Sequence, residues 1–456
     1  MGQVGVELNQ MLPGGRVVCG AEEVSSYTHD AARATYDQPL AVVRPRQTAD
    51  VSALVAYCYD RGIPLVARGA GTGLAGGANA VVGCVVVSFE DMTKILRIDP
   101  NERLAVVQPG VVNQDLREAC ATQGLWYPPD PASAPWSTIG GNAATNAGGV
   151  CCVKYGVTRD YVLGLEAVVG RGEVVRLGRR TAKGVAGYDL AGLMVGSEGT
   201  LGLITELTLR LRGARPPERT VVGYFEDLPS AGRAVAAIVV SGVVPSALEL
   251  VDRYCLRAVS DWKAMALPDG GNVLLLARCD GPGSAGEVDA DVVLACFASA
   301  GAMHAARSRD DAEAESLFAA RRLVFPALSR LGAVLNEDVC VPRTQLPMIL
   351  EHIERVADEY DIQIASLAHA GDGNVHPMIV VPPDDKEAAT RAIEAFDRIV
   401  DEAIALGGTV SGEHGIGLLK KHSLAKEVSP TVLALHRRVK EAFDPEGIFN
   451  PGKVFA

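Results

Sequence analysis

The stretch RGAGTGLAGGAN at residues 68–79 constrains the fold more strongly than any other feature of the sequence. Its residues 71–76 match the GxGxxG pattern of dinucleotide-binding loops, and the strand-like PLVAR precedes them. In a Rossmann fold this loop must open a helix whose N-terminus binds the pyrophosphate. Here GGAN and the strand-like VVGCVVVSF follow, so no helix fits and a Rossmann fold is disfavoured. Because backbone N–H groups of consecutive glycines can converge on an anion beside Arg68, we predict a pyrophosphate-binding loop of another kind.

The composition is that of a globular protein large enough to bury an extensive core. The chain has 456 residues, of which 48% are hydrophobic and 21% charged. Its net charge of −12 argues against unspecific binding to nucleic acid or anionic lipid. The N-terminal residues do not resemble a secretory signal, and no run of 18 apolar residues occurs, so we expect a cytoplasmic protein without a transmembrane span.

Strand-like and helix-like segments alternate irregularly, which predicts an α+β protein. We expect a helical lead-in over residues 1–37, a first domain over 38–214, a second α+β domain over 217–430, and a C-terminal segment, 431–456, that packs back on the first domain. Within the first domain, residues 162–178 predict a β-hairpin and residues 199–212 a pair of strands. Helices are predicted over 230–241, 310–330, 343–360, 385–406 and 430–443, with strands over 272–279 and 362–371.

The segment HAGDGNVH brings two histidines together. Asp-Gly at 372–373 is a strong signal for a two-residue hairpin turn. A hairpin centred on this pair places His369 directly opposite His376, close enough for both imidazoles to bind one metal ion. The alternative is that the two are unrelated surface histidines.

Several motifs together resemble one flavoprotein family. PLVARGAGTGLAGG, STIGGNAATNAGGVCCVKYG, VGSEGTLGLIT, HAGDGNVHP, SGEHGIG and FDPEGIFNPGKVF occur in this order along nearly the whole chain. They resemble the FAD-linked D-2-hydroxyacid dehydrogenases, which include D-lactate dehydrogenases and the flavin subunit of glycolate oxidase. The resemblance implies the fold of vanillyl-alcohol oxidase and p-cresol methylhydroxylase: an FAD-binding domain of two subdomains, plus an α+β substrate domain.

The resemblance also implies non-covalent FAD and the residues that hold it. A histidyl link to the flavin is disfavoured because no His occurs between His29 and His304, and a thioether to Cys152 is disfavoured as well. The implied FAD-binding residues are Arg68, Gly69, Ala70, Gly71, Thr72, Gly73, Leu74, Pro109, Gly110, Ser133, Thr138, Ile139, Gly140, Gly141, Asn142, Asn146, Gly148, Gly149, Ile204, Asn450 and Lys453.

In the resembled family the two histidines and the Glu of SGEHGIG bind one divalent metal. Carried over, His369, His376 and Glu413 are metal ligands, and His414 is the catalytic base. Two nitrogens and one carboxylate suit Zn²⁺, Mn²⁺ or Fe²⁺. Arg321 matches a substrate-binding arginine of the family, while Arg322 and Arg330 are expected on a solvated helix face.

These residues predict oxidation of a D-2-hydroxyacid to a 2-oxoacid, with hydride transfer to flavin N5. The 2-hydroxyglutarate branch carries a Thr and a Lys where this chain has Phe325 and Asn336, so we favour a monocarboxylate such as D-lactate or glycolate. D-2-hydroxyglutarate dehydrogenase and the flavin subunit of a multi-subunit glycolate oxidase stay open as alternatives. A metal-dependent hydrolase using the same three ligands is the non-redox alternative.

The electrons must pass to an external acceptor. A quinone, a cytochrome, an electron-transfer flavoprotein or an iron–sulfur subunit could each serve. A membrane acceptor would require peripheral association with the inner face of the membrane. The sequence leaves the oligomeric state open, with a homodimer among the options, and it predicts no nucleic-acid partner.

Overall fold

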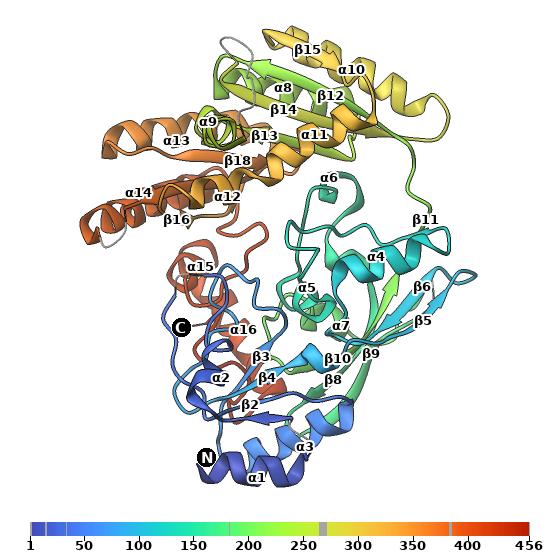
Figure 1. The fold of residues 1–456 in the computed structure, drawn as a ribbon, viewed down its shortest axis with the longest axis vertical. Helices are drawn as coiled ribbons and strands as arrows, with labels where there is room; N and C mark the ends of the chain where they lie inside the picture. The colour runs from blue at the N-terminus through green and yellow to red at the C-terminus, as the bar shows by residue number, and fades with distance from the viewer. Residues whose placement is uncertain are drawn as a thin grey trace. The chain divides into compact units, whose positions relative to one another are not determined.

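Residues 2–13, 16–32, 34–181, 183–263, 271–382 and 385–455 are described by the computed structural model (Figure 1). They form two units, each assembled from segments far apart in the sequence. Unit 1 comprises Met1–Gly148, Gly156–Arg215 and Glu413–Ala456, and unit 2 comprises Gly149–Tyr155 and Pro216–Gly412. We expected the second domain to run to about residue 430, whereas the segment that follows Gly412 belongs to unit 1.

The first layer of unit 1 is a four-stranded sheet in the order β1-β2-β4-β3. Strands β2, β4 and β3 are parallel, and β1 pairs antiparallel with β2. The Val-rich strands and helix α3 bury a shared apolar cluster to which the C-terminal Ile448 and Phe449 contribute. The elements are α1 Gln3–Met11, β1 Val17–Val18, α2 Ala21–Ser25, β2 Ala41–Val43, α3 Thr48–Tyr59, β3 Leu65–Arg68, β4 Val85–Ser88 and the 3₁₀ helix Phe89–Asp91.

The second layer of unit 1 is a five-stranded antiparallel sheet in the order β5-β6-β10-β8-β9. Helices α4, α5 and α7 contribute side chains to its core. The elements are β5 Ile95–Asp99, β6 Leu104–Val107, α4 Asn113–Ala121, β7 Leu125–Trp126, α5 Ile139–Thr145, the 3₁₀ helix Thr158–Tyr161, β8 Val162–Val169, β9 Glu173–Gly178, α7 Leu190–Met194, β10 Leu203–Arg210, β11 Arg212–Gly213, α15 Lys421–Glu427 and α16 Pro430–Phe443.

Two sequence expectations for unit 1 need correction. The predicted hairpin over 162–178 is confirmed as β8 and β9. Residues 199–212 do not form a strand pair with each other: they contain one long strand, Leu203–Arg210 (β10), and the first residue of β11, which pairs with β7. The glycines of this segment precede the strand, so nothing within 203–210 favours a turn. The lead-in is also not purely helical, because β1 pairs with β2 at the edge of the first sheet.

Unit 2 contains an eight-stranded sheet, ordered β15-β12-β14-β13-β18-β19-β16, with β17 also paired to β19. All of its pairings are antiparallel. The strands are β12 Glu218–Phe225, β13 Ala247–Val251, β14 Val273–Asp280, β15 His304–Arg307, β16 Ala333–Asn336, β17 Val339–Cys340, β18 Ala365–His369 and β19 Asn374–Val381.

Helices cover both faces of this sheet (Figure 1). Helices α9, α11 and α12 share a core with Leu274, Leu276 and Leu367 of one face. On the other face, Phe225 of β12 meets Phe297 of α10 edge to face, with ring centroids 5.6 Å apart. The helices are α6 Cys152–Tyr155, α8 Leu228–Ser241, α9 Arg253–Lys263, α10 Ala285–Ser299, α11 Asp311–Arg322, α12 Val324–Ser329, the 3₁₀ helix Arg343–Gln345, α13 Leu346–Tyr360 and α14 Lys386–Ala405.

Most of the predicted helices are confirmed. Helices α8, α13, α14 and α16 occupy the expected ranges, while the range 310–330 is divided into α11 and α12 at Leu323.

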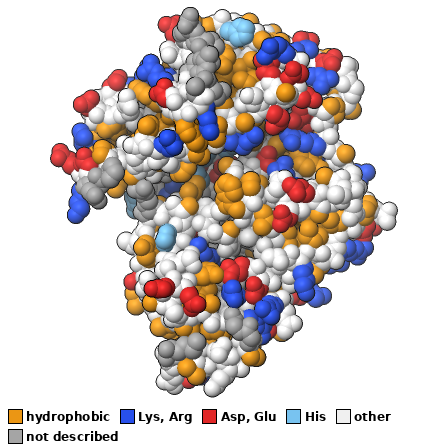
Figure 2. All heavy atoms as spheres, in the orientation of Figure 1, with side chains coloured by type: hydrophobic (Ala, Val, Ile, Leu, Met, Phe, Trp, Pro, Cys, Tyr) orange, Lys and Arg blue, Asp and Glu red, His pale blue; other side chains and the backbone are white. Residues whose placement is uncertain are grey.

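None of the helices described is long and apolar enough to cross a membrane. Acidic and basic side chains are interspersed over the face shown in Figure 2.

The C-terminal tail is held beside β3 by one buried carboxylate. Asp444 accepts hydrogen bonds from the backbone N–H groups of Ile448 (3.0 Å) and Phe449 (2.8 Å) and forms an ion pair with Lys440. Leu65 of β3 then donates to the carbonyl of Ile448 at 2.7 Å. Asp444 thus fixes the turn from which the tail enters the first sheet.

We predict that Asp444→Ala destabilises the protein by about 3 kcal/mol, because it removes these bonds and leaves the partly buried ammonium of Lys440 without its carboxylate. The matched control is Glu446→Ala at an exposed position of the same turn, which should change stability by no more than about 0.5 kcal/mol. Thermal unfolding of both variants checks this, and equal midpoints would contradict it.

Candidate active site

The glycine-rich loop that follows β3 contains no helix between residues 69 and 84, as the sequence predicts. The second predicted flavin stretch approaches this loop, because a Cβ at Gly69 would collide with the Thr138 hydroxyl. Thr138 caps α5 by accepting a hydrogen bond from Gly141 N–H at 3.2 Å. Gly140 N–H donates to the Pro109 carbonyl at 2.8 Å. Three of the predicted FAD-binding stretches therefore meet in unit 1, where glycines leave the backbone accessible.

The C-terminal tail completes this region. Asn450 donates its side-chain amide to the carbonyls of Gly77 (2.9 Å) and Glu198 (2.6 Å). Lys453 donates to the carbonyl of Asn79 at 2.8 Å and to Asn450 Oδ1 at 2.9 Å. Burial lowers the pKa of Lys453 to about 8. Both predicted tail residues thus lie on the glycine-rich loop.

The remaining predicted FAD-binding residues are spread along the same unit, with one exception. Asn146 ends α5 in the left-handed conformation and accepts a hydrogen bond from Arg159 N–H at 2.8 Å. The Ser133 carbonyl accepts from Ser137 N–H at 2.7 Å, and Ile204 pairs with Ala167 between β10 and β8. Gly149 belongs to the short segment of unit 2.

Residues 1–37, from which no chemistry was predicted, supply contacts to the loop. Arg68 donates to the carbonyls of His29 (2.7 Å) and Ser26 (3.2 Å), and burial lowers the pKa of its guanidinium. Asp30 accepts a hydrogen bond from Ala78 N–H at 3.3 Å, and burial raises its pKa. The lead-in segment therefore anchors both ends of the glycine-rich loop.

Glu198 is a buried residue whose part in this region the sequence analysis missed. It lies in VGSEGTLG, has a positive φ of 52° and is 8% exposed. Its carboxylate accepts hydrogen bonds from the N–H groups of Ile416 (2.7 Å) and Gly417 (2.9 Å), directly after the GEHG motif. Burial raises its pKa to about 7. The only sequence signal was a carboxylate among glycines.

In unit 2 the histidines of HAGDGNVH lie on one face of the sheet, although the predicted register is wrong. His369 pairs with Asn374 and Leu367 with His376, so the loop spans four residues, 370–373. Gly373 has a positive φ of 78° but Asp372 does not, which excludes the two-residue turn that we predicted. His376 lies two residues beyond Asn374 and therefore on the same face as His369. The ring centroids are 5.4 Å apart, so the two side chains are neighbours nonetheless.

Each histidine has a buried carboxylate next to its Nδ1 atom. Glu249 Oε1 is 2.8 Å from His369 Nδ1, and Asp338 Oδ1 is 3.7 Å from His376 Nδ1. Both acids are 0% exposed, and both histidines are at most 6% exposed. Carboxylates that accept the Nδ1 proton are typical neighbours of metal-binding histidines, because they orient the ring and leave Nε2 for the metal.

Of the three candidate arginines, only Arg321 lies at the histidines. Its Nε is 2.6 Å from Glu249 Oε2. Arg322 is half-exposed and lies 3.8 Å from Glu315, and Arg330 lies over the Trp262 ring at 5.2 Å. Sequence reasoning missed Glu249, whose signal was a single acid inside the apolar strand ALELV.

The chain leaves unit 2 through the segment that precedes Glu413 and His414. Thr409 pairs with Cys340 of β17, and Ser411 donates to Asp338 Oδ2 at 2.8 Å, so this segment is fixed to β17 and the residue before it. Glu413 and His414 are the next residues of unit 1, where a Cβ at Gly148 would collide with the Glu413 carboxylate. Within unit 1, Glu413 therefore lies on one of the predicted flavin stretches.

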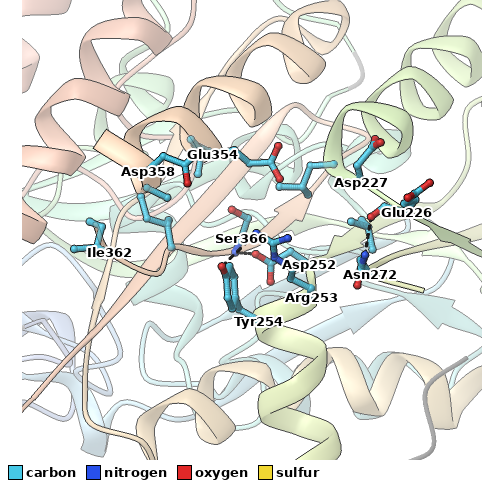
Figure 3. A pocket seen from close by; sticks show the side chains of 15 residues that line it. Glu226, Asp227, Asp252, Arg253, Tyr254, Asn272, Glu354, Asp358, Ile362 and Ser366 are labelled. Atoms are coloured by element: carbon cyan, nitrogen blue, oxygen red, sulfur yellow. Dashed lines mark hydrogen bonds between the residues drawn. The ribbon is translucent and has the colours of Figure 1, made fainter. Parts of the chain in front are cut away.

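A separate hollow of about 290 Å³ lies on the opposite face of the unit 2 sheet (Figure 3). It contains Ser366, whose neighbours Ala365 and Leu367 point to the face of the histidines. Asp252 accepts a hydrogen bond from Ser366 N–H at 2.6 Å, and burial raises the pKa of Asp252 to about 6. None of the predicted site residues lines this hollow.

Comparison with known proteins gives two family matches. The FAD binding domain family matches residues 39–178, and the family of FAD linked oxidases, C-terminal domain, matches residues 215–454. Glycolate oxidase subunit GlcD of Bacillus subtilis is 39% identical to this chain, over 94% of this chain and 92% of the relative. The D-lactate dehydrogenase of Anaerostipes hadrus is 35% identical, over 96% and 94%. The D-2-hydroxyglutarate dehydrogenase of Stutzerimonas stutzeri is 33% identical, over 99% and 98%.

A solved structure of p-cresol methylhydroxylase is similar in fold, with a TM-score of 0.80 at 19% identity. It covers 98% of this chain and 95% of the other. The expected fold of the vanillyl-alcohol oxidase and p-cresol methylhydroxylase type is therefore confirmed.

We predict a pH-dependent contribution of Glu198 to stability. Its pKa is about 7 in the folded protein against an ordinary 4.5, so between these values the folded state holds a proton that the unfolded state has lost. Stability from this group is therefore present below pH 4.5, falls as the pH rises and is lost above pH 7. The fall is at most about 3 kcal/mol.

In Glu198→Gln this fall should be absent, and thermal midpoints of the FAD-loaded protein from pH 5 to pH 8 measure it. The control is Glu102→Gln at an exposed position. Midpoint curves for E198Q that run parallel to those of the wild type would contradict the prediction.

Proposed function

The chain belongs to the FAD-linked oxidase family, and on that premise we propose that it oxidises a D-2-hydroxyacid to the 2-oxoacid. The observation that carries the proposal is the pair of buried histidines, His369 and His376, each with a carboxylate behind it and with Arg321 beside them. The flavin-dependent family excludes the metal-dependent hydrolase that such a pair would also allow.

FAD is proposed to bind on unit 1. The glycine-rich loop 68–74, Pro109-Gly110, residues 138–142 and the tail residues Asn450 and Lys453 would hold it, because their backbones approach one another without intervening side chains. Bound FAD supplies the acceptor for the hydride that leaves the substrate Cα. The protein contributes the binding and orientation of the substrate.

A divalent metal, Zn²⁺, Mn²⁺ or Fe²⁺, is proposed to bind His369, His376 and Glu413. Imidazole nitrogens and one carboxylate fit such an ion, and the hydrogen bond between Glu249 and His369 Nδ1 directs Nε2 of His369 to ligation. A bound metal ion polarises the substrate hydroxyl and lowers its pKa.

The remaining steps belong to side chains. Arg321 is proposed to bind the substrate carboxylate, since a guanidinium matches a carboxylate in a bidentate manner. His414 is proposed to accept the hydroxyl proton, because a neutral imidazole is suited to this near pH 7. Arg321 would thus orient the substrate and its Cα–H bond, and His414 would take the proton from the substrate hydroxyl group.

A monocarboxylate such as D-lactate or glycolate is the proposed substrate. Phe325, four residues after Arg321, is apolar and 43% exposed, and Asn336 carries no charge. A second carboxylate at these positions would lack a cation. The electrons are proposed to pass to a quinone, a cytochrome, an electron-transfer flavoprotein or an iron–sulfur subunit, the last in keeping with the relative named as a glycolate oxidase subunit.

We predict that anaerobic mixing of the FAD-loaded protein with D-lactate bleaches the flavin absorbance and that a chelator prevents this. His376→Ala should behave like the chelated wild type, because it removes a ligand. Bleaching that the chelator leaves unchanged would contradict the metal, and a flavin that no 2-hydroxyacid bleaches would contradict the reaction.

We predict that kcat/KM is at least about tenfold higher for D-lactate than for D-2-hydroxyglutarate, because an unpaired carboxylate loses about 1.5–3 kcal/mol of charge-assisted hydrogen bonding. Replacing Phe325 by Thr and Asn336 by Lys should shift this ratio toward the dicarboxylate. Steady-state rates with a dye acceptor measure both, and a wild-type preference for D-2-hydroxyglutarate would contradict the assignment.

A further inference from the structure

Glu249 is an acidic residue at the centre of a fully buried strand. Every residue of β13, Ala247–Val251, is buried, and Glu249 is 0% exposed. An ionised carboxylate in such a place is costly unless charged or hydrogen-bonding partners surround it. Its partners therefore indicate why a carboxylate stands at this position.

Two residues with different proposed tasks share this one carboxylate. Oε1 is 2.8 Å from Nδ1 of His369, and Oε2 is 2.6 Å from Nε of Arg321. The terminal NH2 group of Arg321 is 3.5 Å from both ring nitrogens of His369, so the arginine and the imidazole are also neighbours. Rotating either side chain away would break its contact with Glu249.

We propose that Glu249 is a positioning residue that fixes the proposed metal ligand His369 and the proposed carboxylate-binding residue Arg321 relative to each other. This inference rests on the proposed function. By accepting the Nδ1 proton of His369, Glu249 selects the tautomer in which Nε2 carries the lone pair that a metal would bind. By engaging Nε of Arg321, it leaves the terminal amino groups for the substrate carboxylate.

Sheet geometry supports this assignment. Glu249 pairs with His369 between β13 and β18, so the two side chains project from directly opposite positions on the same face. Arg321 comes from the last turn of α11, which packs on that face. The carboxylate is thus held by the sheet while its two partners come from a neighbouring strand and a covering helix.

The test is Glu249→Gln in the FAD-loaded protein, with Glu315→Gln as the matched control. Glu315 lies on α11, is 62% exposed at its side chain and pairs with Arg278 and Arg322. Affinity for Zn²⁺ or Mn²⁺, measured without substrate by competition with a chelator, should fall at least tenfold in E249Q. The KM for D-lactate should rise about tenfold as well, whereas E315Q should keep both values of the wild type.

A purely structural ion pair would lower the thermal midpoint of E249Q and leave both affinities of the folded protein unchanged, and this result would overturn the inference. Glu249→Asp provides the second variant if E249Q does not fold. It keeps the charge but is one methylene too short to reach both partners, so we expect loss of metal affinity or a raised KM.

Failure of the proposed function can be distinguished from failure of the inference about Glu249. A wild-type protein that binds no divalent metal would overturn the proposed metal site and the role of Glu249 with it. A wild-type protein that binds metal and oxidises D-lactate, together with an E249Q variant of equal affinity and KM, would overturn the inference alone.

Discussion

The antiparallel pairing of β18 with β13 and β19 determines where the chemistry of unit 2 can lie. This pairing puts Glu249, His369 and His376 on one face of the sheet, within reach of Arg321 on α11. A shift of one residue in either pairing would turn a histidine or the carboxylate to the opposite face. These three side chains of unit 2 are thus held by the centre of the sheet, which suits the proposed role of the two histidines as metal ligands.

The candidate cofactor-binding region of unit 1 relies on accessible backbone, whereas the candidate site of unit 2 relies on charged side chains. A dinucleotide cofactor needs backbone that can approach it closely, and the loop 68–79 and α5 offer glycines in contact with each other. Backbone of this kind has little packing of its own. Asp30 of the lead-in and Asn450 and Lys453 of the tail therefore hold the loop through hydrogen bonds to its N–H and carbonyl groups.

The sequence predicts that the two histidines meet, but it does not predict the local geometry that brings them together. The histidine pair follows from HAGDGNVH, yet the register is off by two residues because the turn has four residues with only Gly373 at positive φ. A register error of two residues keeps both imidazoles on the same face, because side chains alternate between the faces of a strand. The two histidines are therefore neighbours, but they do not lie directly opposite each other as predicted. Glu249 and Glu198 were not predicted because a carboxylate inside an apolar strand or a glycine-rich turn reveals its partners only in three dimensions. The ligand role of Glu413 and the catalytic role of His414 rest on the family resemblance alone.

The order of the segments along the chain determines which unit can be completed first during synthesis. Strand β3 lies early in the sequence, but its hydrogen-bonding partners Ile448 and Asn450 are synthesised after all of unit 2. The whole sheet of unit 2 lies between them. The sheet of unit 2 can therefore form during translation while the glycine-rich loop still lacks these partners, so the cofactor-binding unit is completed after unit 2.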